Sequence, residues 1–204
     1  MMPAVVRFDG EQLRASLGAL TSWQRVAFAV SCVEVLVPSY ARFSEIEEVG
    51  DPELVRTVVD AVWSSLGTSD GFSMPPDLPS PDAVKELLPT EDDWNEWAPQ
   101  AEDAIAALVY LLELIRSDDV EMAAYTSERA YAAVDEFTAR EQELEVLDAS
   151  DRESLLESAS IQTELQRQAT TLDILRNRGA DSSAIAELRV LAQRAPIGGP
   201  IEGD

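Results

Sequence analysis

The chain has 204 residues, a length that suggests one domain, and its 39 acidic and 15 basic residues give a formal net charge of -24 at pH 7. Such a field repels phosphate backbones and anionic membrane surfaces, so it argues against nucleic-acid and membrane partners. The chain contains no histidine, which excludes Ser-His-Asp and Cys-His catalysis and the usual zinc sites.

The excess of acidic residues is local to the middle of the chain. Residues 45–164 carry 31 acids and 6 bases, a net charge of -25 (6 - 31), whereas residues 165–204 carry 5 of each. A field of this sign would attract a basic protein partner and speed the encounter. The alternative is that acidic helix faces only keep the protein soluble.

The first part of the chain predicts two helices. Residues 9–20 form a short helical pattern with leucines along one face. Ser22 can cap a second helix, at about residues 23–48, which carries the most apolar stretch of the sequence. Because Pro38 lacks an amide donor, we expect this helix to kink or break near residues 35–38.

The clearest helix boundaries lie in "GDPELVRTVVDAVWSSLG". Asp51 is placed to cap the helix, Pro52 fits its first turn and Gly67 ends it. The two glycines and four prolines of residues 67–81 then predict a surface connection. A short helix is expected at residues 81–88.

Long helical patterns return in the second half. Residues 89–98, "PTEDDWNEWA", predict an ordered loop or a helical turn. Apolar residues then recur at helical spacing in four segments, at about residues 100–116, 119–147, 150–178 and 182–194. No run alternates with the period of a strand.

We therefore predict an all-α fold. Long helices with short connections are typical of a single-domain antiparallel helical bundle, here with about seven or eight helices. We expect the domain to occupy residues 1–195 and "PIGGPIEGD", residues 196–204, to form a flexible C-terminal tail.

Cysteine usage and the lack of targeting signals favour a cytoplasmic location. Cys32 is the only cysteine, so no internal disulfide can form, and its apolar neighbours are typical of a small buried hydrophobe. The sequence predicts neither a secretory leader nor a membrane span.

Few catalytic motifs remain. "GTSDGF" lacks the lysine and the strand–loop–helix setting of a phosphate-binding loop, and no EF-hand loop matches. We predict no cofactor and no metal site, although the many carboxylates leave an all-carboxylate Mg²⁺ or Ca²⁺ site open. Whether the protein is an enzyme stays undecided, and the missing motifs lean against it.

Glu34 is the one charged residue in "VAFAVSCVEVLVPSY". A buried carboxylate must be paired or protonated, because leaving it charged and alone is costly. On the next helix, Arg56 and Asp60 lie four residues apart, hence on one face, with Trp63 a further turn away. We expect the guanidinium of Arg56 to bind both carboxylate oxygens of Glu34 through two hydrogen bonds, while Asp60 pairs with the other side of the guanidinium. Tyr40 would supply a hydroxyl near the kink.

This candidate polar cluster, Glu34, Tyr40, Arg56, Asp60 and Trp63, has more than one interpretation. It can be a buried ion network that fixes the register of two helices. It can also be a pocket wall that presents charge to a polar ligand. A third interpretation has Glu34 facing solvent at the kink.

A second constellation places tryptophans among acids. The candidate partner surface consists of Glu91, Asp92, Asp93, Trp94, Glu96 and Trp97. Such a surface is typical of a cation-accepting interface, because Trp anchors interfaces and attracts Arg through its ring face. The alternative is that both rings seal the end of the bundle.

These motifs together resemble a known family. "SWQRVAFAVSCVEVLVPSYARF" followed by "GDPELVRTVVDAVWSSL" is similar to the bacterial YjaG-like family, a domain of unknown function. The matching positions are Trp23, Gln24, Phe28, Glu34, Pro38, Tyr40, Phe43, Arg56, Asp60 and Trp63, and Asp103 in "AEDAIAAL" looks like a later Asp of the family. The resemblance weakens after about residue 140, and the prolines at 75–81 and the Gly-Pro tail depart from the family pattern.

The resemblance implies an all-helical, soluble bacterial protein of uncharacterised activity, without known catalytic residues or cofactor. It therefore supports the fold class and leaves the function open.

The residues favour a non-catalytic interaction module. In its sharpest form this is an immunity-type or antitoxin-like inhibitor that covers the basic surface of a protein partner such as a nuclease effector. The alternative is a small-molecule-binding sensor or enzyme with a polar cleft around Glu34, Arg56 and Asp60. A structural subunit that forms a homo-oligomer is a third hypothesis.

Overall fold

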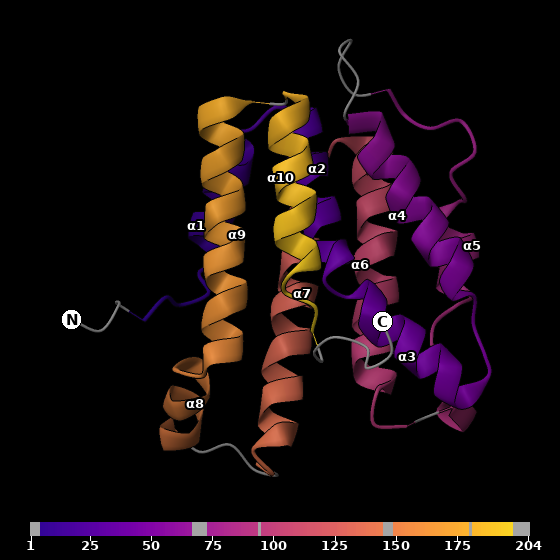
Figure 1. The fold of residues 1–204 in the computed structure, drawn as a ribbon, viewed down its shortest axis with the longest axis vertical. Coiled ribbons are helices and arrows are strands. Elements are labelled where there is room, and N and C mark those ends of the chain that lie inside the picture. The colour runs from indigo at the N-terminus through magenta and orange to yellow at the C-terminus, as the bar shows by residue number, and fades with distance from the viewer. Residues whose placement is uncertain (1–4, 67–72, 94, 145–148, 180, 198–204) are drawn as a thin grey trace.

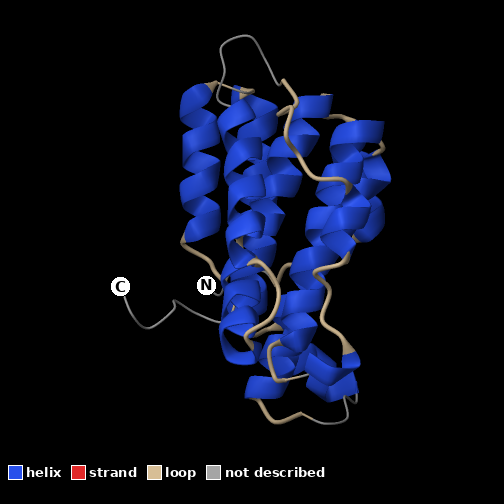
Figure 2. Cartoon of the chain, turned by 90° about the vertical axis from the view of Figure 1, so that its right-hand side faces the viewer, coloured by secondary structure: helices blue, strands red, loops and turns tan. Residues whose placement is uncertain are grey.

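The computed structural model describes residues 5–66, 73–93, 95–144, 149–179 and 181–197. Over these ranges the chain forms ten α-helices and one 3₁₀ helix, with no strand (Figure 2). The all-α class and the helical bundle are therefore confirmed, although the helices outnumber the expected seven or eight.

The helices follow one another as α1 (Gly10–Gly18), α2 (Ser22–Glu34), α3 (Val37–Glu47), α4 (Pro52–Leu66), α5 (Pro81–Lys85), η1 (Glu91–Asp93), α6 (Ala98–Ser117), α7 (Val120–Glu141), α8 (Ala149–Leu156), α9 (Ala159–Arg178) and α10 (Ser182–Gln193). Figure 1 shows α8 and α9 on the left of the bundle and α3, α4 and α5 on the right, with α10 between them.

The central helix of the bundle is α2. It contacts α4, α6, α7, α9 and α10, and all nine residues from Val26 to Glu34 are buried. A helix that is covered on all sides has to be apolar all round, which explains why this segment is the most apolar of the sequence. It also places the single charge of that stretch, on Glu34, inside the protein.

The break expected near Pro38 is present. Helix α2 ends at Glu34 and α3 begins at Val37, with Pro38 in its first turn, where a missing amide donor costs nothing. The carbonyl group of Val35, left unpaired by the break, accepts a hydrogen bond from the amide of Ile197 at 3.0 Å. Ser39 Oγ in turn donates to the carbonyl oxygen of Ile197 at 2.8 Å.

The end of the chain therefore takes part in the fold. Ile197 is buried, so the docked chain continues two residues past the expected domain boundary at residue 195. The remainder of the predicted tail, residues 198–204, lies outside the described residues.

Several other boundaries differ from the expected ones. The helix expected at residues 81–88 ends at Lys85, and the one expected at about residues 119–147 ends at Glu141. Thr21 caps α2 in place of Ser22, because Gln24 three residues later completes a capping box with it. The helix expected at residues 150–178 is interrupted after Leu156, where Ser158 caps α9 through the amide of Ile161. The cap expected from Asp51 is confirmed by its hydrogen bond to the amide of Leu54. Ser80 caps α5 in the same way through the amide of Ala83.

Helices α6 and α7 form the closest helix pair. They are consecutive and joined by Asp118 and Asp119. Both helices carry small buried side chains: Ala101, Ala104 and Ala107 on α6, and Ala123, Ala124, Ala130 and Ala133 on α7. Small side chains of this kind allow packed helices to approach closely.

The turn between α3 and α4 is fitted to one tyrosine. Gly50 has a left-handed φ of 80°, and a Cβ added to it would overlap Tyr40 Oη and lie 3.1 Å from Cζ. The Tyr40 hydroxyl accepts a hydrogen bond from the amide of Asp51 at 3.2 Å. Burial raises the pKa of Tyr40, an effect that this hydrogen bond partly offsets.

The segment Ser22–Glu47, which spans α2 and α3, is long and apolar enough to cross a membrane by length and composition. In the fold, 83% of its most apolar window is buried against the other helices. Core helices of soluble proteins satisfy the same criterion, so the apolar character of this segment is accounted for by the bundle.

Candidate functional site

The polar cluster around Glu34 forms as the sequence predicts at its centre. Arg56 Nη1 donates to Glu34 Oε1 at 2.7 Å and Nη2 donates to Oε2 at 2.9 Å. The Glu34 side chain is 2% exposed and that of Arg56 is 35% exposed. The ion pair thus joins the buried end of α2 to the surface of α4.

Other side chains complete the coordination of Glu34. Trp63 Nε1, one helical turn beyond Asp60 on α4, donates to Oε2 at 2.8 Å. Gln193, at the end of α10, donates from Nε2 to Oε1 at 3.3 Å. The carboxylate therefore accepts four hydrogen bonds from two helices.

Asp60 has the role expected for it, with an additional partner. Its carboxylate lies 3.5 Å from Arg56 Nε and also pairs with Arg189 of α10. The predicted pair of acids around Arg56 is thus extended by a second arginine, which brings α10 into the cluster.

Two opposing effects determine the pKa of Glu34. Burial raises the pKa of the Glu34 carboxyl, but the hydrogen bonds and charge of Arg56, together with the bonds from Trp63 and Gln193, outweigh burial and lower that pKa below its usual value. Glu34 is therefore a paired anion at neutral pH rather than a protonated acid.

Tyr40 does not belong to this cluster. Its hydroxyl is bonded to the amide of Asp51 at the α3–α4 turn. The break after Glu34 puts Tyr40 on a separate helix, so its direction does not follow from that of Glu34.

Most donors and acceptors at the centre of the cluster are bonded to one another, although the buried Arg56 Nε lies 3.5 Å from Asp60 without a hydrogen bond. The geometry therefore supports the interpretation of an ion network that fixes α2, α4 and α10.

The second candidate surface joins two acidic segments. Asn95, two residues after the end of η1, donates from Nδ2 to Glu47 Oε1 at 2.6 Å and so ties the end of α3 to the segment that follows η1. We call the carboxylates of these two segments the acidic end; its residues are Glu45, Glu47, Glu48, Glu91, Asp92, Asp93 and Glu96. Helix α3 reaches this end at the lower right of Figure 1.

Trp97 is not a free cation acceptor. Its ring packs on Phe137 with the centroids 5.7 Å apart, and the guanidinium of Arg140 lies 5.6 Å from the ring centroid. Arg140 also donates to the carbonyl oxygen of Glu96. The cationic partner that the sequence suggested for this ring is thus an arginine of the same chain, and the ring seals the bundle; Trp94 lies outside the described residues.

A fully buried ion pair lies on α9. Arg167 donates to both carboxylate oxygens of Glu164, at 2.6 and 2.7 Å, and the two side chains are 2% and 3% exposed. Arg167 Nη1 also donates to Ser31 Oγ at 3.1 Å, and Gln168 Nε2 donates to Glu164 Oε1 at 2.8 Å. Ser127 completes the network by donating to Gln168 Oε1 at 2.6 Å.

The arginine of this pair also contacts Cys32. Arg167 Nη2 lies 3.5 Å from Cys32 Sγ. Burial raises the pKa of the Cys32 thiol to about 11, although the charge of Arg167 opposes the rise. A thiol that stays protonated and inaccessible is a small core residue, as expected from its apolar neighbours.

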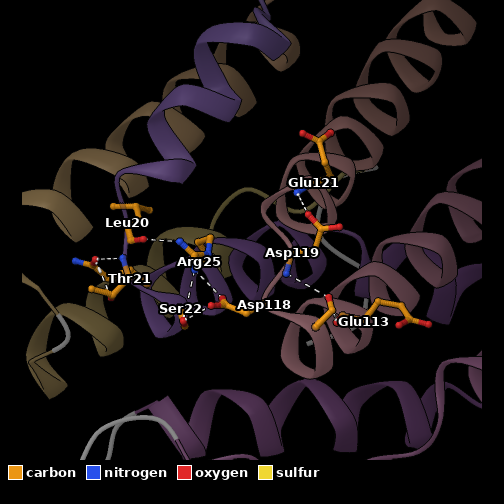
Figure 3. Close-up of polar contacts among 10 residues, drawn as sticks. Leu20, Thr21, Ser22, Arg25, Glu113, Asp118, Asp119 and Glu121 are labelled. Atoms are coloured by element: carbon orange, nitrogen blue, oxygen red, sulfur yellow. Dashed lines mark hydrogen bonds and ion pairs between the residues drawn. The ribbon is translucent and has the colours of Figure 1, made fainter.

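A further polar cluster ties two helix junctions together (Figure 3). Asp118, between α6 and α7, accepts hydrogen bonds from Ser22 Oγ at 2.6 Å and from Arg25 Nη2 at 2.7 Å. Arg25 Nη1 donates back to the carbonyl oxygen of Leu20, and Asp119 caps α7 through the amide of Glu121. The hydroxyl of Ser22 lowers the pKa of Asp118, with partial burial opposing it and Arg25 adding to it.

Residues 12–198 match the sequence profile of a family described as "Protein of unknown function (DUF416)". The chain belongs to the DUF416 family.

Curated relatives of this DUF416 chain agree with the resemblance noted in the sequence. "Uncharacterized protein YjaG" of Salmonella typhimurium is 32% identical over 102 residues, and the protein of the same name from Escherichia coli is 31% identical over the same length. Each match covers 50% of this chain and 50% of the relative, so the chain spans about half the length of the curated relatives it matches.

A solved structure shares the DUF416 fold. The crystal structure of a DUF416 family protein from Shewanella baltica superposes with a TM-score of 0.76 at 22% identity, over 89% of this chain and 93% of the other. At this level of identity the likeness concerns the fold alone, and it supports the helical bundle described above.

Sequence reasoning missed three polar residues of the DUF416 core. Glu164, Arg167 and Gln168 were not singled out, yet they lie within the buried face of α9 that includes Ile161, Thr171 and Leu175. Helical spacing could have found them, because polar residues that recur at the positions of an apolar stripe must bond one another. Arg189 and Gln193 carried no comparable signal.

The DUF416 chain shows no ready-made metal centre in the part that the structure describes. No group of three or more Cys, Asp or Glu side chains there is arranged to hold an ion. Most of the polar groups described above are engaged with each other, with Arg25 Nε and Arg56 Nε as buried exceptions, which is typical of structural networks.

Proposed function

We propose that this DUF416 chain is a non-catalytic interaction module that binds a basic protein through its acidic end. The carrying observation is the hydrogen bond between Asn95 and Glu47, which supports a single surface formed from two acidic segments more than forty residues apart in the sequence.

Exposure and charge balance support this surface. Ile46 stands among Glu45, Glu47 and Glu48 with 44% of its area exposed, which gives the acidic end an apolar contact as well as charge. Arg42 neutralises Glu45 through an exposed ion pair at 2.8 Å, and the other carboxylates outnumber it. Interfaces commonly combine an apolar contact with a charged rim.

Acidic neighbours also act on two carboxyl groups of helices α6 and α7. Burial raises the pKa of Asp103 to about 6, which Arg129 opposes and the nearby charges of Glu136 and Glu102 increase. Burial likewise raises the pKa of Glu136, with Arg140 opposing the rise and Glu102 and Asp135 adding to it. Burial is the main cause of both shifts, and the like charges contribute a smaller part.

The sharper form of the proposal is an immunity-type or antitoxin-like inhibitor. Its partner would be a basic protein such as a nuclease effector, whose nucleic-acid-binding surface the acidic end would cover. A location in the cytoplasm is part of this proposal, as is a complex with a different protein rather than a homo-oligomer.

The test compares two variants of equal charge. Glu91→Lys/Asp92→Lys changes the acidic end, and Asp77→Lys/Glu86→Lys makes the same charge change at exposed positions elsewhere. A protein captured from the native cytosol at about 50 mM salt is identified, purified and titrated against each variant, since attraction between exposed charges weakens as salt rises.

We expect the acidic-end variant to bind that protein at least tenfold more weakly, and the control variant to bind within about threefold of the parent. Equal weakening by both variants would mean that net charge alone drives capture, and the proposal would be wrong. Sedimentation of the pure protein at micromolar concentration separates it from the homo-oligomer.

A further inference from the structure

The buried network of α9 opens onto hollows on several sides of the helix. A hollow of about 890 Å³ is lined by Arg167, one of about 270 Å³ by Glu164 and one of about 200 Å³ by Gln168. The two larger hollows share Ala159, Thr163 and Ala195, so they meet at the start of α9.

The largest of these three hollows has apolar side chains in its lining. Val5 and Val6 of the N-terminal segment line it together with Leu191 of α10. Gln162 fixes that segment by accepting from the amide of Val6 and donating to its carbonyl oxygen, both at 2.9 Å. Its volume lies in the range of small-molecule sites, roughly 300–1,000 Å³.

The charges of this hollow differ from those of the protein as a whole. Two arginines, Arg167 and Arg194, line it with one acid, Glu157, in a chain of formal charge -24. Arg167 is neutralised by Glu164 in the floor. Arg194 makes no ion pair within the described ranges and is exposed at the end of α10, so its charge is available to a ligand.

We propose that this hollow binds an amphipathic monocarboxylate, with its apolar chain against Val6 and Leu191 and its carboxylate on Arg194. Arginine suits this role because its planar guanidinium binds carboxylates through two hydrogen bonds. The site is separate from the acidic end, so it adds a ligand to the proposed interaction module.

The test uses three probes: octanoate has both groups, octanol lacks the charge and acetate lacks the chain. Titration calorimetry and thermal unfolding of the full chain should show saturable binding of octanoate, with octanol and acetate at least tenfold weaker. Octanol binding equal to that of octanoate, or no octanoate binding at millimolar concentration, would overturn the proposal.

Two variants locate the binding. Arg194→Gln should weaken octanoate at least fivefold and leave octanol unchanged, whereas the control Arg116→Gln, at an exposed arginine of α6, should change neither. Thr163→Trp, which fills the hollow from an exposed helix position, should abolish the binding of both. Circular dichroism and the melting temperature without ligand check that each variant folds. Octanoate binding that survives both Arg194→Gln and Thr163→Trp places the ligand elsewhere and contradicts the proposal.

Discussion

Arg56 binds both carboxylate oxygens of Glu34 with its two terminal nitrogens, at 2.7 and 2.9 Å, across the contact between α2 and α4. Glu34 is buried whereas Arg56 reaches solvent, so the two partners differ in what they lose when the pair is broken. Arg56 can be hydrated, but Glu34 cannot.

Glu34→Gln should therefore destabilise the protein by about 2–3 kcal/mol at pH 7, the scale of hydrogen bonds to charged groups. Urea unfolding with an unchanged m-value measures this loss. Because the folded pKa of Glu34 is lowered, its contribution is present above the usual value of 4.5 and is lost as the pH falls through the folded pKa. The gap between parent and variant should close in acid; a gap that stays constant would contradict the pairing.

The contribution of Asp103 to the stability of the fold should have the opposite pH dependence to that of Glu34. Burial raises the pKa of Asp103 from 3.8 to about 6, so the folded state binds its proton more tightly than the unfolded state and stability is lost as the pH rises from about 4 to 6. At about 1.4 kcal/mol per unit, the loss is about 3 kcal/mol. Asp103→Asn cannot ionise, so its stability relative to the parent should improve by this amount between pH 4 and pH 7 in chemical unfolding.

The turn at Gly50 predicts a matched pair of substitutions. Gly50→Ala adds a Cβ against Tyr40 at a left-handed φ, so a loss of about 2 kcal/mol or more is expected. Gly18→Ala adds a Cβ with no atom within 4 Å at the end of α1, so it should stabilise the protein by about 0.5–1 kcal/mol. Thermal unfolding of both variants tests the contrast, and a Gly50→Ala protein as stable as the parent would exclude the close fit to Tyr40.

The buried pair on α9 should be strongly coupled. Glu164→Gln and Arg167→Met each leave one group without its charged partner in the core, at a cost of about 3–5 kcal/mol. The double variant removes both charges, so it should lose clearly less than the sum of the single losses. A double-mutant cycle from urea unfolding measures the coupling, and additive losses would show that the two groups act independently.

The features that could be predicted from the sequence are those that depend on residues close together along the chain. The four-residue spacing of Arg56 and Asp60, the apolar surroundings of Glu34 and the proline at position 38 were enough to predict the ion pair and the break. Those features depend on local periodicity and on the cost of an unpaired charge, both of which are visible in a single sequence.

The missed features depend on contacts between distant segments. Gln193 bonds Glu34 from 159 residues away and Arg189 reaches Asp60 from 129 residues away, and no local pattern marks either one. The same is true of Trp97, whose ring accepts an arginine of α7 rather than one from another protein. Which charge meets which ring was set by packing, not by composition.

The bond between Ile197 and Val35 has a consequence for synthesis on the ribosome. The apolar α2 segment precedes all five helices that contact it, and three of these, α7, α9 and α10, follow about a hundred residues or more later. The carbonyl at the helix break gains its partner only when residue 197 emerges. A nascent chain would thus carry its most apolar helix only partly covered until the last helices emerge, and transiently exposed apolar surface of this kind favours aggregation.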